Sequence, residues 1–97
     1  MDVERLDRED RLTFQLTGRL DAHQVPRIRA ELEPLDRDFT LDLAGTGFID
    51  STGLAMLVTL TKRARERGVE FEVINLQDSV KLIVELTRLD QVLPIVN

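Results

Sequence analysis

A serine in the middle of the chain has both the residue type and the surroundings that a modifiable side chain needs. Ser51 follows Asp50 and precedes Thr52, where an apolar stretch at residues 39–44 runs through two glycines into a helical pattern. In a unit of strand, loop and helix, functional groups gather where the strand ends and the helix begins. A hydroxyl at that point faces unpaired backbone N–H groups and a positive local field. We therefore expect Ser51 to be a phosphorylation site and the surface around it to be a docking site.

The same position also has a purely structural interpretation, which stays open beside the functional one. Ser and Asp are preferred N-cap residues, so Ser51 or Asp50 can simply cap the following helix. The two roles are compatible, because a phosphate carries about −1.5 to −2 charges and a helix N-terminus tolerates them. Phosphorylation should therefore leave the fold intact and act on whatever docks over the loop. A phosphate buried there without a matching cation costs several kcal/mol.

Glycines around the serine raise the alternative of a nucleotide-binding loop. Gly45, Gly47 and Gly53 flank the segment, but their spacing fits neither Gly-x-Gly-x-x-Gly nor the P-loop. A P-loop also needs a lysine beside its Ser or Thr, and the first lysine of the chain is Lys62. We expect the glycines to provide a tight turn and a flat surface for approach rather than a cofactor site.

Hydrolytic and metal chemistry find little support in the sequence. His23, the single histidine, could form a Ser-His-Asp set with Asp21 and Ser51, because loops after adjacent parallel strands meet at one end of a sheet. However, no Gly-x-Ser-x-Gly motif surrounds the serine, and 97 residues leave little room for a substrate pocket. One histidine without cysteine makes no metal site. We expect no catalytic residue, metal or cofactor, and a small serine hydrolase is a remote alternative.

The composition restricts the classes of partner. The 97 residues suffice for one domain at residues 1–97, and 42% hydrophobic with 32% charged residues is typical of a globular protein. The net charge of −5 argues against nucleic acid. No apolar run approaches the roughly 20 residues of a membrane span, so no membrane insertion is expected. The lack of cysteine and of a signal-peptide pattern indicates a cytoplasmic protein.

Strands alternating with helices would place the serine loop at the end of a layered fold. Strict alternation at residues 11–17 predicts a half-buried strand. The next helix should begin near Val25, carry an apolar stripe as far as Leu35 and end at Pro34. The order predicts an α/β fold with a largely parallel sheet, in which the first strand or two can pair antiparallel. Further strands are expected at residues 3–6, 39–44, 69–76 and 92–96 (the last a strand or an extended tail), and further helices at residues 54–67, ended by Gly68, and 79–89, capped by Asp78.

Two groups of apolar residues lie outside the main helical stripes. Met56, close to the serine, stands where a solvated helix face would carry charge, so we interpret it as part of a partner surface. Leu82, Leu86 and Leu89 form a ridge on the third helix. We interpret this ridge as ordinary core, because helices packed in two layers have wide apolar faces.

Several motifs follow one another along the chain in a characteristic order. They are Gly18-Arg-Leu-Asp21, Leu41-Asp-Leu43, Phe48-Ile-Asp-Ser-Thr-Gly-Leu54, residues 80–89 and Val92-Leu-Pro-Ile95. This pattern resembles a STAS domain, and most of all the bacterial anti-sigma-factor antagonists, with the Asp-Ser-Thr-Gly-Leu segment as its most specific part. The resemblance spans almost the whole chain. It implies a single STAS-like domain with a small mixed, mostly parallel sheet of four or five strands flanked by three or four helices.

The resemblance also implies a regulatory cycle. The unmodified protein would bind an anti-sigma factor that is also an ATP-dependent serine kinase with a histidine-kinase-like ATPase fold, and so release the sigma factor. Phosphorylation of Ser51 would break the complex, and a serine phosphatase would reset it. Thr52, where many members have a second serine, departs mildly from the pattern and is a backup acceptor. The expected partner-binding residues are Asp21, Asp50, Ser51, Thr52, Gly53, Leu54 and Met56.

A second function within the same fold stays open. In a STAS subunit of a lipid-transport ABC complex, the equivalent loop binds the ATPase and need not be phosphorylated. The pair Asp50-Ser51 and the Gly-Arg-Leu-Asp turn favour the sigma-factor pathway.

Overall fold

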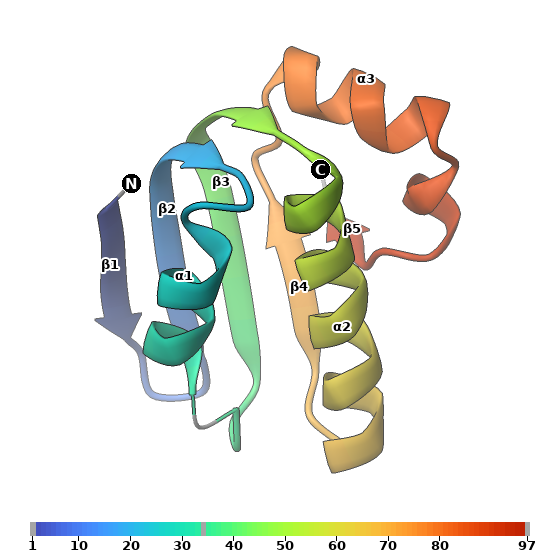
Figure 1. The fold of residues 1–97 in the computed structure, drawn as a ribbon. Coiled ribbons are helices and arrows are strands. Elements are labelled where there is room, and N and C mark those ends of the chain that lie inside the picture. Colours follow the sequence, from blue (N-terminus) through green and yellow to red (C-terminus); the bar gives the residue numbers. More distant parts are fainter. Residues whose placement is uncertain (1, 34, 97) are drawn as a thin grey trace.

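Five strands form one mixed sheet in the computed structural model, which describes residues 2–33 and 35–96. The order of the strands in the sheet follows their order in the chain; the first pair is antiparallel and the others are parallel. The α/β class and the mostly parallel sheet are therefore confirmed. The strands are β1 (Asp2–Asp7), β2 (Leu12–Leu20), β3 (Phe39–Ile49), β4 (Phe71–Ile74) and β5 (Ile95–Val96) (Figure 1).

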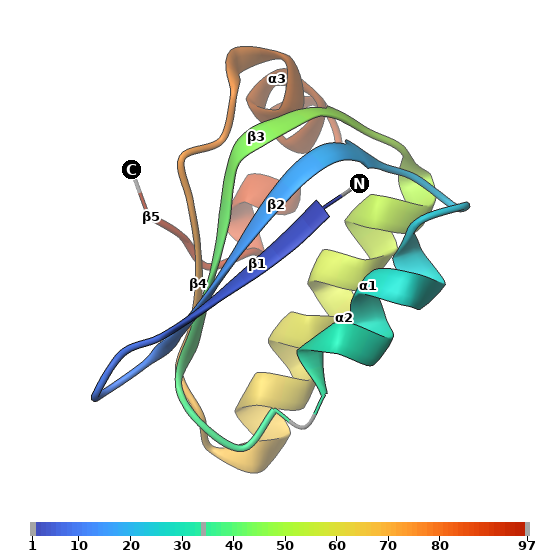
Figure 2. The same ribbon diagram turned by 90° about the vertical axis from the view of Figure 1, so that its left-hand side faces the viewer.

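Two helices, α1 (Val25–Leu32) and α2 (Ser51–Arg67), lie side by side on one face of the sheet (Figure 2). The third, α3 (Asp78–Leu86), lies at the end of the sheet where β3 leads into α2, and the short 3-10 helix η1 (Leu89–Gln91) follows it. Each pair of parallel strands is joined through a helix, which is the connection that parallel pairing requires. No helix in the described part of the chain is long and apolar enough to cross a membrane.

The core fills the space between the sheet and the two helices on its face. Leu12, Phe14 and Leu16 are buried along β2, as the alternation predicts. The rings of Phe39 on β3 and Phe71 on β4 stack with their centroids 4.5 Å apart. These two residues are also partners in the strand register, so their stacking holds the central strands in line.

Strand β3 is longer than predicted. The glycines at 45 and 47 indicate a loop after residue 44, but the chain continues as a strand to Ile49. The register against β2 shifts twice, so β3 takes up extra residues as bulges, where glycine is at home. A Cβ atom on Gly45 would lie 2.7 Å from the side-chain oxygen of Thr17 on β2. The prediction of a loop here is wrong because glycine marks a close approach of two strands instead.

The first helix is shorter than its apolar stripe. It ends at Leu32, and Glu33 is extended, with φ −82° and ψ 149°, as favoured for a residue before proline. The prediction that Pro34 ends the helix concerns a residue outside the described ranges. Leu35 is buried, but from the segment after the helix rather than from its stripe.

The elements near the C-terminus are also shorter than predicted. Strand β4 covers four of the residues expected at 69–76, and β5 covers two of those expected at 92–96. Helix α3 starts at Asp78 itself, in place of being capped by it, and it ends at Leu86. A left-handed residue, Arg88 with φ 60°, then turns the chain into η1. In contrast, Gly68 ends α2 in the left-handed conformation, as predicted.

Met56 is a core residue, and its interpretation as part of a partner surface is wrong. Its side chain is 2% exposed. The buried stripe of α2 runs through Gly53, Met56 and Leu60, at the spacing of three and four residues that one helix face requires. Because Gly53 has no apolar side chain, the hydrophobic pattern of the sequence does not show that the buried face begins there, and Met56 therefore falls outside the stripe that this pattern shows.

The leucine ridge shows the opposite outcome. Leu82 is 56% exposed and Leu86 is 74% exposed, so the interpretation of these two residues as core is wrong. Leu89 is partly buried and packs against the core. Helix α3 is buried through Val80 and Val84, and its other side faces solvent because no second helix within the described ranges covers it (Figure 1).

The two edges of the sheet are unlike regular free strands. On β1, the exposed side chains are charged, among them Asp2, Glu4, Arg5 and Asp7. At the other edge, β5 has two residues. Charged and very short edge strands are poor templates for pairing with another chain.

Truncating Met56 and Leu86 should separate core from surface. We expect Met56→Ala to lower the free energy of unfolding by about 2–5 kcal/mol, because it leaves a cavity. Leu86→Ala, the matched control on an exposed site, should change it by less than about 0.5 kcal/mol. Urea unfolding followed by circular dichroism measures both. Equal losses in the two variants would contradict the burial described above.

Candidate functional site

The ends of β2 and β3 bring the candidate residues to one edge of the sheet. The strands run parallel, with Arg19 opposite Phe48. Gly18 has a φ of 122°, which glycine adopts readily, and a register shift follows it directly. The backbone N–H of Asp50 then donates to the carbonyl oxygen of Leu20 over 3.2 Å. The two strands therefore stay paired up to the point where each one turns toward its helix.

Asp50 joins the two loops that leave these strands. Its Oδ1 accepts the N–H of Gly53 (2.9 Å), which makes Asp50 the N-cap of α2. Its Oδ2 accepts the N–H of Ala22 (3.0 Å), in the turn between β2 and α1. The N–H of Gly53 above all, with that of Ala22 in addition, holds the pKa of Asp50 below its ordinary value, because both donors favour the charged carboxylate.

Asp21 shapes the turn before α1. Its Oδ1 accepts the backbone N–H groups of His23 and Gln24, each over 3.1 Å, and its Oδ2 faces the Nε of Arg19 at 3.5 Å. The carboxylate is thus engaged by the backbone and by an arginine. Among the described residues, no hydrogen bond joins the ring of His23 to Asp21 or to Ser51, so the geometry of a Ser-His-Asp set is not assembled.

Ser51 is the first residue of α2, and it is exposed. Because Asp50 occupies the N-cap, the hydroxyl of Ser51 is not needed to cap the helix, which settles the choice left open between the two residues. No hydrogen bond within the described part of the chain uses this hydroxyl. Thr52 follows it and is half-buried. An enzyme can therefore approach Ser51 more readily than Thr52.

Gly53 and Leu54 support the loop from below. A Cβ atom on Gly53 would lie 2.4 Å from the carbonyl oxygen of Leu20 and 2.7 Å from a side-chain carbon of Ile49, so α2 approaches β2 as closely as glycine allows. Leu54 is 7% exposed and belongs to the core. Both residues position the Ser51 loop but contribute little accessible side-chain surface to it. Met56 lies in the core and contributes no such surface.

Arg19 and Phe48 lie beside this surface, and the sequence patterns assign neither of them a role. The guanidinium carbon of Arg19 is 3.9 Å from the centroid of the Phe48 ring. Phe48 is 37% exposed, unusual for a large aromatic residue in a sheet. The sequence indicates only that each residue lies near the end of a strand and within one of the motifs described above. Their contact depends on the shifted register between β2 and β3, which the sequence does not show.

Helix α3 is attached to the same end of β3 by side chains. The amide nitrogen of Gln77 donates to the carbonyl oxygen of Ala44 (2.7 Å), and the hydroxyl of Ser79 donates to that of Gly47 (3.1 Å). These bonds serve the part of β3 that extends beyond its pairing with β4. The loop that carries Ser51 is therefore supported from both sides of β3.

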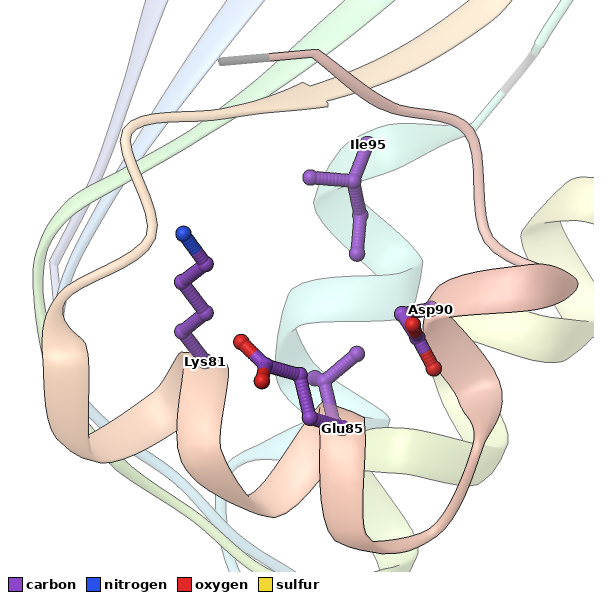
Figure 3. A pocket seen from close by; sticks show the side chains of 5 residues that line it. Lys81, Glu85, Asp90 and Ile95 are labelled. Atoms are coloured by element: carbon purple, nitrogen blue, oxygen red, sulfur yellow. The ribbon is translucent and has the colours of Figure 1, made fainter.

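A hollow of about 200 Å³ lies between α3, η1 and β5. Figure 3 shows Lys81 and Glu85 of α3, Asp90 of η1 and Ile95 of β5 around it. Its volume is below the roughly 300–1,000 Å³ typical of ligand pockets, and charged side chains form much of its wall. It does not include a residue of the Ser51 loop.

Comparisons with known proteins agree on one family. The family model described as "Mlab, STAS domain" matches residues 3–96. Among curated proteins, the chain is similar to an anti-sigma-B factor antagonist of Listeria monocytogenes, with 28% identity over 92 residues that cover 91% of this chain and 81% of the relative.

Solved structures show the same fold. An anti-sigma factor antagonist from Mycobacterium paratuberculosis aligns with a TM-score of 0.86 and 18% identity, over 97% of this chain and 83% of that one. The anti-sigma factor antagonist SpoIIAA in its unphosphorylated form aligns with a TM-score of 0.79 and 16% identity, over 98% and 86%. At these identities the likeness establishes the fold alone.

The stability of a Gly53 variant should test how closely α2 approaches β2. Alanine is favoured over glycine in a helix by about 1 kcal/mol, so a loss of stability in Gly53→Ala must come from the contact with the Leu20 carbonyl. We expect a loss of about 1–3 kcal/mol in urea unfolding. Gly47→Ala is the control, because its Cβ would meet a single side-chain atom, on Gln77, at 3.4 Å. A Gly53→Ala protein as stable as wild type would contradict this geometry.

The lowered pKa of Asp50 predicts a pH-dependent contribution to stability. The carboxylate stabilises the folded state above the unfolded pKa of about 4, and this contribution is lost as the pH falls through the lower folded value. Asp50→Asn keeps the shape but cannot accept both N–H groups. The stability difference between wild type and Asp50→Asn should be constant above about pH 5 and should shrink below about pH 4. Thermal unfolding across this range tests it, and a difference that grows on acidification would refute the assignment.

Proposed function

The chain belongs to the STAS domain family, and from this premise we propose that it is an anti-sigma-factor antagonist controlled by phosphorylation of Ser51. In the cytoplasm, the unmodified protein binds an anti-sigma factor that is also a serine kinase, and thereby frees the sigma factor. The protein is the substrate of that kinase and not itself an enzyme. The observation that carries the proposal is the exposed hydroxyl of Ser51, on a loop pair that Asp50 holds in place.

The relatives support this choice among the functions that the fold can host. The curated relative from Listeria monocytogenes is named an anti-sigma-B factor antagonist. Both structural neighbours described above carry the name anti-sigma factor antagonist too, although their likeness to this chain concerns the fold. One of these neighbours was solved in a form described as unphosphorylated, which agrees with a function that depends on modification.

The proposed modification is a phosphoryl transfer from ATP. The Oγ of Ser51 forms a bond to the γ-phosphorus, the bond from that phosphorus to the β-phosphate oxygen breaks, and ADP leaves with the displaced charge. The hydroxyl proton passes to a base of the kinase. A serine phosphatase resets the protein by transferring the phosphoryl group to water, which restores the hydroxyl and releases inorganic phosphate.

The placement of Ser51 explains why phosphorylation would act on binding and not on folding. The cap of α2 is the carboxylate of Asp50, so a phosphate on Ser51 replaces no hydrogen bond among the residues that the structure describes. The phosphate also lies at a helix N-terminus, where negative charge is tolerated. It lies beside the charged carboxylate of Asp50, however, and covering both anions with a partner surface costs several kcal/mol.

The second candidate is the accessory subunit of a lipid-transport ABC complex. It would present the same loop to an ATPase without modification. The two functions predict different proteins that co-purify with this chain from its own cells. Co-purification of a kinase with the histidine-kinase-like ATPase fold supports the sigma-factor pathway, whereas an ABC ATPase supports the transporter subunit.

Variants at the acceptor test the switch directly. Wild type, Ser51→Ala and Thr52→Ala are incubated with the co-purifying kinase and ATP, and the loop peptide is analysed by mass spectrometry. We expect one phosphate on wild type and on Thr52→Ala, and none on Ser51→Ala. In calorimetry, phosphorylated wild type should bind at least about 100-fold more weakly than the unmodified protein, from a penalty of several kcal/mol.

Two further results decide the interpretation. Ser51→Ala should bind the kinase equally tightly with and without ATP treatment, because it has no acceptor, and Ser51→Asp should fold as wild type but bind weakly. Phosphorylated wild type that binds as tightly as the unmodified protein would refute the switch. Phosphate found on Thr52 in the wild-type protein would move the acceptor by one residue.

A further inference from the structure

Arg19 and Phe48 form a charged and aromatic pair next to the proposed acceptor. The guanidinium of Arg19 lies over the Phe48 ring at 3.9 Å, and its Nε contacts the carboxylate of Asp21 at 3.5 Å. The side chain of Arg19 is nonetheless 65% exposed. Neither the cap of α2 nor the core depends on this pair, so its presence at the surface calls for an explanation.

Both contacts of Arg19 are easily exchanged. An exposed ion pair near the upper limit of distance contributes little stability, and an exposed cation–π contact contributes a modest amount. A phosphoserine carries nearly two charges and three strong acceptor oxygens, and a guanidinium binds phosphate with two parallel hydrogen bonds. A phosphate near Arg19 would therefore compete successfully with the single charge of Asp21.

Ser51 is joined to both contacts of Arg19 by short stretches of chain and one hydrogen bond. It is three residues after Phe48, so the two Cα atoms are at most about 11 Å apart. The turn that contains Asp21 is joined to the residue before Ser51 by the hydrogen bond from the N–H of Ala22 to Asp50. Arg19 thus contacts a group on each of the two segments that surround the serine.

The other charged groups around the loop are mostly anions, which cannot pair with a phosphate. Asp50 and Asp21 are anions with structural roles, and Asp78 begins α3. His23 is exposed, and its backbone N–H is bonded to Asp21. Arg27, in the first turn of α1, is exposed and is the competing arginine.

We propose that Arg19 is the internal counter-ion of phosphorylated Ser51, and that its guanidinium leaves Asp21 and Phe48 to pair with the phosphate. The inference rests on the proposed function for the modification itself, but the pairing is a property of this chain alone and needs no partner protein. Phosphorylation then alters the docking surface at two places. It adds an anion at Ser51, and it uncovers the ring of Phe48 beside it.

A titration of the phosphate tests the pairing without a kinase. The full chain is made with phosphoserine encoded at position 51, and ³¹P NMR follows its second ionisation, near pH 6 in a free phosphoserine. A nearby cation lowers this pKa, so Arg19→Gln should raise it by about half a unit or more. Arg19→Lys should give a smaller rise.

Two arginines serve as controls. Arg65→Gln removes an exposed cation about 21 Å along α2 from the phosphate, so it should leave the pKa unchanged. Arg27→Gln should also leave it unchanged. A pKa that responds to Arg27→Gln and not to Arg19→Gln would overturn the proposal, as would a pKa that responds to neither. Amide spectra of the unmodified variants confirm that each protein is folded.

A second measurement follows Arg19 itself. In the unmodified protein the ring current of Phe48 should shift the Arg19 side-chain proton resonances upfield, with Phe48→Leu as the reference without a ring. Phosphoserine at position 51 should remove this shift, and its persistence would contradict the movement. The outcome is separable from the proposed function: pairing can be observed in a protein that no kinase modifies, and a kinase can switch binding in a protein whose Arg19 does not move.

Discussion

One carboxylate holds together the two loops from which the candidate site is built. Asp50 accepts an N–H from the first turn of α2 and another from the turn before α1, so its two oxygens join segments 28 and three residues away in the chain. The close contact of Gly53 with Leu20 acts in the same direction, since it leaves no space for the helix to shift relative to β2. These contacts attach the two loops of the candidate site firmly to the sheet.

This arrangement separates the chemistry from the architecture. Asp50 provides the helix cap, and the proposed acceptor hydroxyl belongs to its neighbour Ser51, so a modification of this hydroxyl leaves the cap of α2 intact. The hydrogen bonds from Gln77 and Ser79 to β3 support the loop from the other side. In the proposed function, phosphorylation therefore changes the surface that contacts the partner and leaves the fold unchanged. The movement of Arg19 would change this surface further, because it uncovers the ring of Phe48.

Local patterns predict much of this protein, and they fail where burial depends on distant neighbours. The alternation in β2, the stop at Gly68 and the start of a helix at the Asp-Ser pair are set by residues adjacent in the chain. Met56 and Leu86 are equally apolar, but one faces the core and the other faces solvent, and the position of the surrounding elements decides which. Likewise, the contact between Arg19 and Phe48 depends on bulges that shift the register of two strands, and no spacing within either motif contains that information.

The edges of the sheet bear on how such a protein can find its partners. A chain with an open, regular edge can be recruited by strand addition, a mode in which the main chain supplies affinity and many sequences qualify. Here the charged side chains of β1 disfavour pairing with another strand at one edge, and at the other edge β5 is only two residues long. In the proposed function, recognition depends on side chains at the loop end of the molecule, where a single substitution can change the choice of partner. Related proteins in one cell could then share this architecture and still respond to different signals.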